Sequence, residues 1–308
     1  MAWLRLVRWK NLLIIFLTQF FAWRCVIVPH ISAFNHGLPI RDIINFFCLS
    51  VSTLLIAAAG YIINDYFDIK IDTINRPEKV VLGKAIERKE AIALHFVLNV
   101  IALVLAGYVA IQVHVYQWLL LQLSCTVLLL FYSTHFKRQY IIGNVVVALL
   151  TALTIIILII YNPVLDHGTR LSVNVLLMYA WFAFILTWMR EIVKDMEDFK
   201  GDEAEGCMTM PIKRGLKFSI GFIRVLSALV VLPLMAACYL LFLHEMRLMA
   251  AYVLCLLAFP VIGWALYLGN KFSTAHYHDA SKKLKIIMVL GICSLIVYYI
   301  QLFLLHAT

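Results

Sequence analysis

Two short acidic segments contain the residues best suited to chemistry. The first runs from Asp65 to Asp72 and the second from Asp195 to Asp202, and both follow the pattern Asp-x-x-Asp-x-Lys-x-Asp. On a helix, positions i, i+3 and i+7 share one face, so each segment presents three carboxylates together. Such like charges repel one another unless a cation binds between them. The repeat therefore predicts two facing metal-binding surfaces, whose metal-ligating and catalytic residues are Asp65, Asp68, Asp72, Asp195, Asp198 and Asp202.

The ligand type indicates which metal and which reaction to expect. Carboxylate oxygens suit Mg²⁺, which typically binds proteins through one or two carboxylates together with substrate phosphates. Two facing acidic surfaces would hold Mg²⁺ ions that share a diphosphate. Metal ions and nearby Lys and Arg side chains neutralise the charge that develops when a diphosphate departs. The segments therefore predict Mg²⁺ as cofactor and a diphosphate as leaving group.

Long apolar runs must position these segments. The chain is 64% hydrophobic and 14% charged, whereas a soluble globular chain is about 45–50% apolar and about 25% charged. About 20 apolar residues are needed to cross the hydrocarbon core as a helix. The runs are apolar all round and do not alternate, which excludes a soluble bundle and a β-barrel. Nine membrane-spanning helices are predicted, at approximately residues 11–29, 43–64, 91–113, 116–134, 141–161, 172–190, 218–243, 248–269 and 284–305.

The positive charge has a topological explanation. A net charge of +9 would suggest a nucleic-acid partner for a soluble protein. Here most of the 26 Lys and Arg residues fall on one side if the N-terminus is cytoplasmic, which follows the positive-inside rule. Four predicted spans separate the acidic segments, so both emerge on that side. We therefore expect no nucleic acid, a surrounding of membrane lipids, and a site that faces the cytoplasm from the cell (inner) membrane.

This location also indicates the substrate. A site at the end of a bilayer-buried bundle would receive a molecule with a polar diphosphate head and a hydrocarbon tail in the membrane. A prenyl diphosphate donor fits that description. A transporter is less consistent with the sequence, because transporters place their acids near the bilayer midplane, at interrupted helices.

Several other polar residues have two interpretations each. Residues 73–90 form either a lid over the acidic surface or a solvated connector. Lys137 and Arg138 are either membrane anchors or phosphate contacts. Asn11 opens the first span, where asparagine is a common helix cap. The segment 271–279, with His276 and His278, is predicted to be a polar loop and not a metal site, because helical ligands would be three or four residues apart.

The chain resembles the UbiA superfamily of intramembrane prenyltransferases. The resemblance lies in an Asn-Asp-x-x-Asp-x-x-x-Asp motif after the second helix, an Asp-x-x-x-Asp motif after the sixth, and a block between them, and it spans essentially the whole chain. The matching residues are Asn64, Asp65, Asp68 and Asp72; Asp198 and Asp202, preceded by Asp195; and Tyr132, Ser133, Lys137, Arg138, Gly143 and Asn144.

Membership would imply an all-α bundle of nine transmembrane helices with cytoplasmic cap loops. It would be one domain over residues 1–308, with repeated halves at about 1–140 and 141–270 and a ninth helix at 284–305. The implied reaction is Mg²⁺-dependent ionisation of a prenyl diphosphate and transfer of the allylic cation to an acceptor. The substrate-binding residues expected on this basis are Asn11, Asn64, Arg76, Tyr132, Ser133, Lys137, Arg138, Asn144, Arg190 and Lys194.

The acceptor is the least constrained part of the interpretation. The stretch from Arg190 to Asp198 is most similar to the branch that makes digeranylgeranylglyceryl phosphate, in which a glycerol hydroxyl attacks and an ether forms. The resemblance therefore favours geranylgeranylglyceryl phosphate or a related glycerol-phosphate lipid. An aromatic acceptor, as in quinone biosynthesis, and a terpene cyclase remain as alternatives.

Overall fold

The computed structural model describes residues 2–307, apart from residues 36, 76, 79, 163–164, 166–169 and 270–271. This part of the chain is helical and contains no strand, with one isolated bridge between Leu82 and Ile86. The α-helices are α1 (Ala2–Leu6), α2 (Trp9–Ala22), α3 (Val28–Asn35), α4 (Ile40–Phe67), α5 (Ile69–Asn75), α6 (Arg88–Gln112), α7 (Leu119–Thr134), α8 (Ile142–Ile160), α9 (Arg170–Glu197), α10 (Phe199–Ala204), α11 (Met210–Arg214), α12 (Leu216–Leu243), α13 (Arg247–Tyr252), α14 (Phe259–Tyr267) and α15 (Thr274–Ala307). Shorter 3₁₀ and π segments are η1 (Trp23–Ile27), η2 (Tyr116–Trp118), η3 (Phe136–Arg138) and η5 (Val253–Ala258).

Within the described residues, nine helical segments are long and apolar enough to cross a membrane, as predicted. Two boundaries differ from the prediction by more than about three residues. The sixth span continues to Glu197 and the ninth begins at Thr274, so His276 and His278 lie in a helix and the predicted polar loop is wrong. Hydropathy locates the apolar part of a helix only, whereas backbone hydrogen bonding continues through its charged turns.

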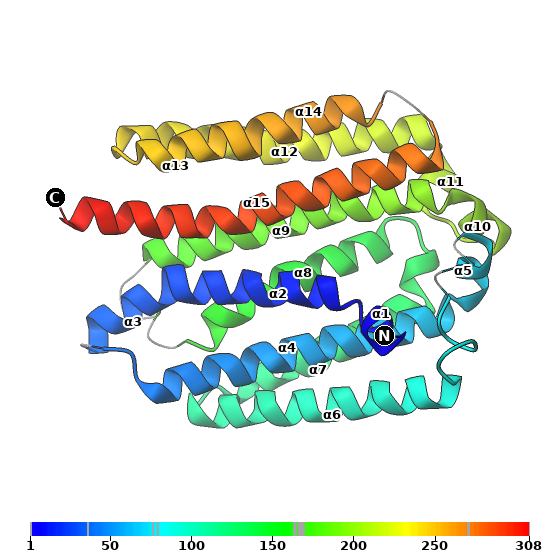
Figure 1. Cartoon of the computed structure of the whole chain (residues 1–308), viewed down its shortest axis with the longest axis horizontal. Coiled ribbons are helices and arrows are strands. Elements are labelled where there is room, and N and C mark those ends of the chain that lie inside the picture. Colours follow the sequence, from blue (N-terminus) through cyan, green and yellow to red (C-terminus); the bar gives the residue numbers. More distant parts are fainter. Residues whose placement is uncertain are drawn as a thin grey trace.

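The long helices lie side by side and run roughly along one axis (Figure 1). Contacts are most extensive between α4 and α6, between α8 and α9, and between α9 and α15. Small residues allow close approach at the first of these interfaces, where Ala59 and Ala102 are fully buried and the Ser52 hydroxyl donates to the Ala102 carbonyl at 2.7 Å. Such short, dry contacts hold together helices that gain little from the hydrophobic effect inside a bilayer.

The two acidic segments lie at the same end of the bundle, where α5, α10 and α11 gather at the right of Figure 1. The segment after the first acidic segment, residues 73–90, packs at this end of the bundle, and part of it is buried. Leu82 and Ile86 are buried in a small core with Leu6 and Ile62, and a narrow hollow is bounded jointly by Asp65, Asp72 and Val80 to Leu82. The structure therefore favours the lid interpretation for the described part of this segment.

Candidate active site

Asp68 and Asp198 occupy equivalent positions in the two halves. Each interrupts a long helix in the sparsely populated region between helix and strand, with φ and ψ of −90° and 0° at Asp68 and −91° and 7° at Asp198. A short helix follows each break, and the amides of Asp72 and Asp202 donate back to the carbonyls of Asp68 and Asp198 at 2.8 and 3.1 Å. The sequence repeat is therefore also a structural repeat.

A clasp made by Asn75 and Gly201 joins the two short helices α5 and α10. The Asn75 side chain donates to the Asp198 carbonyl at 3.1 Å and accepts from the Gly201 amide at 3.0 Å. A Cβ at position 201 would collide with the Asn75 amide group, so any residue other than glycine would displace that side chain. The equivalent position of the first segment is Ile71, and this difference between the repeats was the only sequence signal for the clasp.

Lys137 lies among carboxylates from both segments. Its ammonium pairs with Asp68, which is 4% exposed and also accepts from the Asn64 amide at 2.6 Å. Burial lowers the pKa of Lys137, but the stronger combined attraction of Asp68, Asp72 and Asp202 raises it overall. A half-buried cation therefore lies where the two acidic segments meet.

Arg8, near the N-terminus, forms an ion pair with the first segment. Its side chain donates to Asp65 at 2.6 Å and its guanidinium lies 5.1 Å from the centre of the Tyr61 ring. Arg8 has a left-handed backbone, with φ of 50° and ψ of 51°, which is uncommon for a residue other than glycine. Burial lowers the pKa of this group, whereas Asp65 raises it, and the net shift is upward.

The carboxylates of the second segment are buried to a similar degree, with Asp202 4% exposed and Asp195 and Asp198 half-buried. Asp195 accepts from the Asn144 amide at 2.8 Å. Burial raises the pKa of Asp202 to about 7, with Lys137 opposing the shift and the neighbouring carboxylates adding to it. Burial likewise raises the pKa of Asp72 to about 6, with Asp68 as the next cause. These mutual effects show that the two segments share one electrostatic environment.

The donor set suits a magnesium ion that is also held by phosphate. Within the described part of the chain, no group of three or more His, Cys, Asp or Glu side chains is arranged so that it could hold a metal ion by itself. The carboxylates instead converge on Lys137, and the Asn64 side-chain oxygen is buried without a hydrogen-bond partner among those residues. Hard oxygen donors with an incomplete shell match Mg²⁺, which leaves positions for water and substrate phosphates.

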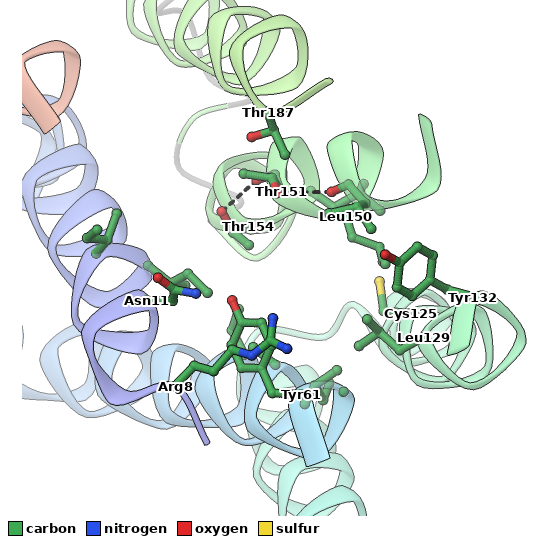
Figure 2. A pocket seen from close by; sticks show the side chains of 18 of the residues that line it. Arg8, Asn11, Tyr61, Cys125, Leu129, Tyr132, Leu150, Thr151, Thr154 and Thr187 are labelled. Carbon is green, nitrogen blue, oxygen red and sulfur yellow. Dashed lines mark hydrogen bonds between the residues drawn. The ribbon is translucent and has the colours of Figure 1, made fainter. Parts of the chain in front are cut away.

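A cavity of about 240 Å³ lies beside the acidic segments and runs between helices of both halves (Figure 2). Along α4 its lining extends from Thr53 to Asn64, a rise of about 16 Å. Most of the wall surface is apolar, and Ile14, Ile56, Leu121, Cys125, Leu129 and Leu150 are among the residues that contribute to it. Polar side chains that line it are Arg8, Asn11, Thr53, Tyr61, Asn64, Gln122, Tyr132, Thr151, Thr154, Thr187, Arg190, Glu191, Lys194 and Lys285. Such a space accommodates a hydrocarbon chain with a charged head.

The structure brings most of the predicted binding residues together. Those that line the cavity are Asn11, Asn64, Tyr132, Arg190 and Lys194, while Lys137 and Asn144 contact the acidic residues. Two other predicted residues neither line the cavity nor make a described contact with the acidic side chains. Ser133 donates to the Leu129 carbonyl of its own helix, and Arg138 is exposed. Arg76 lies outside the described residues.

Comparison with known proteins agrees with this geometry. The UbiA prenyltransferase family matches residues 26–284. The chain belongs to the UbiA prenyltransferase family. The predicted family, all-α membrane fold and prenyltransferase class are thereby confirmed.

Relatives within the UbiA family include digeranylgeranylglyceryl phosphate synthases of archaea. The protein of Methanothermobacter thermautotrophicus is 34% identical over 170 residues, which is 55% of this chain and only 56% of that protein. The protein of Methanococcus aeolicus is 30% identical over 270 residues, 86% of this chain and 88% of that protein.

Two solved structures extend the comparison. A structure of digeranylgeranylglyceryl phosphate synthase superimposes with a TM-score of 0.67 and 26% identity, over 97% of this chain and 98% of that one. A UbiA homologue of Archaeoglobus fulgidus, solved with GPP and Mg²⁺, has a TM-score of 0.60 and 15% identity over 96% and 99% of the two chains, so it supports the fold alone.

Proposed function

We propose that the chain transfers a prenyl group from a prenyl diphosphate to the hydroxyl of a glycerol-phosphate lipid, such as geranylgeranylglyceryl phosphate, and so forms an ether. The observation that carries the proposal is the pairing of two clasped acidic segments with a largely apolar cavity. The relatives named as digeranylgeranylglyceryl phosphate synthases support this acceptor.

The donor's diphosphate would bind between the two acidic segments. Asp65, Asp68 and Asp72 would hold one Mg²⁺, and Asp195, Asp198 and Asp202 the other. Bound Mg²⁺ would supply charge neutralisation for the departing diphosphate, and the Archaeoglobus fulgidus homologue was solved with both GPP and Mg²⁺. Lys137 would contact diphosphate oxygens, and its position among the carboxylates of both segments supports this role.

The prenyl chain would lie in the cavity with its first carbon near the acidic segments. The bond between that carbon and the diphosphate oxygen breaks, and its electron pair leaves with the diphosphate. Tyr61 and Tyr132 line the cavity from α4 and α7, and aromatic faces attract a developing cation. The acceptor's hydroxyl oxygen then forms the new carbon–oxygen bond and loses a proton.

Glu191 is the residue best placed to take that proton. It is 8% exposed, and it is the only acid among the described residues that line the cavity. Lys194 donates to the Glu191 carboxylate at 2.6 Å and fixes its position. An alkyl hydroxyl needs such a base more than an activated aromatic ring, which is itself a nucleophile.

The proposal extends to domain organisation and orientation. Residues 1–308 would form one domain whose repeated halves each contribute one acidic segment, and the equivalent breaks at Asp68 and Asp198 support that repeat. The basic residues around the acidic end support a cytoplasm-facing site in the inner membrane.

The test is product identification. Purified protein would be incubated with Mg²⁺ and geranylgeranyl diphosphate, in separate reactions with geranylgeranylglyceryl phosphate, with 4-hydroxybenzoate and with no acceptor. Mass spectrometry should detect an ether lipid in the first reaction only. A prenylated ring would replace the proposal with aromatic prenylation, and a hydrocarbon or alcohol alone would replace it with a cyclase.

A further inference from the structure

The charges around the cavity do not balance. Its lining includes four cationic side chains but one acid, Glu191. Arg8 is neutralised by Asp65, and Lys194 by Glu191. The two cations that remain in excess are Arg190 and Lys285.

Lys285 has a neutral partner and cationic neighbours. Its ammonium donates to the Asn11 side-chain oxygen at 2.7 Å, and no carboxylate within the described residues lies at salt-bridge distance from it. The charged groups that act on it are Arg190 and Lys10, both of the same sign. A half-buried ammonium beside like charges is unfavourable, and an anion bound there would relieve the repulsion.

Arg190 is also incompletely satisfied. Its guanidinium reaches Glu191 at 3.4 Å, while Lys194 holds the same carboxylate oxygen at 2.6 Å. The Nε atom of Arg190 is buried and has no hydrogen-bond partner among the described residues. A guanidinium with unused donors binds phosphate oxygens well, because two parallel hydrogen bonds fit its fork.

We propose that Lys285, Arg190 and Asn11 form a phosphate subsite for the acceptor lipid, distinct from the acidic end that binds the donor's diphosphate. The proposal rests on the proposed function and specifies how the acceptor is recognised. The two sites have different cations. Lys137 pairs with Asp68 of the acidic segments and does not line the cavity, whereas Lys285, on α15, does line it. In Figure 2, Asn11 lies across the cavity from Tyr132.

The arrangement also explains how the reacting hydroxyl would be placed. Arg190 and Glu191 are adjacent on α9 and both line the cavity. A phosphate held by Arg190 and Lys285 would bring the neighbouring glycerol hydroxyl toward the Glu191 carboxylate. An acceptor with a phosphate monoester carries close to two negative charges near pH 7, which matches the two excess cations.

Direct binding tests the subsite without depending on turnover. Affinity for geranylgeranylglyceryl phosphate and for the phosphate-free geranylgeranylglycerol would be measured by calorimetry with the wild type, Lys285→Gln and Lys285→Arg in detergent. Lys282→Gln is the matched control, because Lys282 is exposed on the same helix. We expect Lys285→Gln to weaken binding of the phosphate lipid about 10- to 100-fold, the size of a lost charge-assisted hydrogen bond. Lys285→Arg should restore most of it.

The wild type should prefer the phosphate lipid over the phosphate-free lipid by a similar factor, and Lys285→Gln should lose that preference. Donor affinity should stay within about twofold in every variant, because the donor's diphosphate binds elsewhere. Equal affinity of the wild type for the two lipids, or a phosphate preference that survives in Lys285→Gln, would overturn the subsite. Phosphate-dependent binding without ether formation would support the subsite and overturn the proposed reaction instead.

Discussion

Replacing Asn75 with alanine tests whether the two acidic segments work as one site. Asn75 makes two hydrogen bonds across the segments, one to the Asp198 carbonyl and one from the Gly201 amide. The alanine variant removes both bonds and leaves both backbone groups without that partner. Each such bond contributes about 1 kcal/mol net, so the loss is about 2 kcal/mol. At about 1.4 kcal/mol per tenfold change, the clasped arrangement becomes about 30-fold less favoured.

The assay is kcat/KM for the prenyl diphosphate at limiting Mg²⁺. If one diphosphate must contact both segments, Asn75→Ala should lower kcat/KM about 30-fold. Gly201→Ala should have a similar effect, because its Cβ would collide with the Asn75 side chain. The double variant should be no worse than either single one, since alanine at position 75 leaves room for the new methyl group. Ile74→Ala, at an exposed position on the same short helix, is the control.

Two results would refute this reasoning. Wild-type kcat/KM in Asn75→Ala would show that the segments need no clasp. Fully additive losses in the double variant would show that the two residues act separately and not through their contact.

The other predictions concern the carboxyl groups of the site. Asp68→Ala and Asp198→Ala should each abolish product formation while helical content by circular dichroism stays near wild type; turnover in both would remove the two-segment metal site. Glu191→Gln should lower kcat at least about 100-fold, as expected for loss of a general base. A decrease of less than about threefold would show that another group accepts the proton of the acceptor hydroxyl. The pKa values of Asp72 and Asp202, about 6 and about 7, lie above the value of an aspartate in the unfolded chain. The folded metal-free protein therefore binds more protons than the unfolded chain, and its stability should fall as pH rises through 6 and 7. Mg²⁺ must displace these protons in order to bind. The increase in unfolding temperature on adding Mg²⁺ should therefore be larger at about pH 8 than at about pH 5.5. An equal increase at the two pH values would show that the two carboxyls do not bind Mg²⁺.

Features that depend on local spacing could be predicted from the sequence. The nine apolar runs and the two acidic repeats follow from periodicity along the chain, and the structure has both. Tyr132 and Lys137 were predicted together with their neighbours Ser133 and Arg138. Consecutive helical residues point about 100° apart, so one residue of each pair can face the site while the other turns away.

Contacts between distant residues could not be predicted in this way. Arg8 pairs with Asp65 across 57 positions, and Lys285 contacts Asn11 across 274. Each of these cations looked like an ordinary positive-inside residue in the sequence. Only the packing of α15 and of α2, which Arg8 directly precedes, shows that both cations line one cavity.

The most direct test of the central claim is the stoichiometry of a single reaction. Purified protein would be given Mg²⁺, geranylgeranyl diphosphate and geranylgeranylglyceryl phosphate, with diphosphate and ether lipid quantified together. We expect equal amounts of the two products and loss of both when EDTA removes the metal. Diphosphate released without matching ether, or ether formed undiminished in EDTA, would contradict the proposed Mg²⁺-dependent transfer.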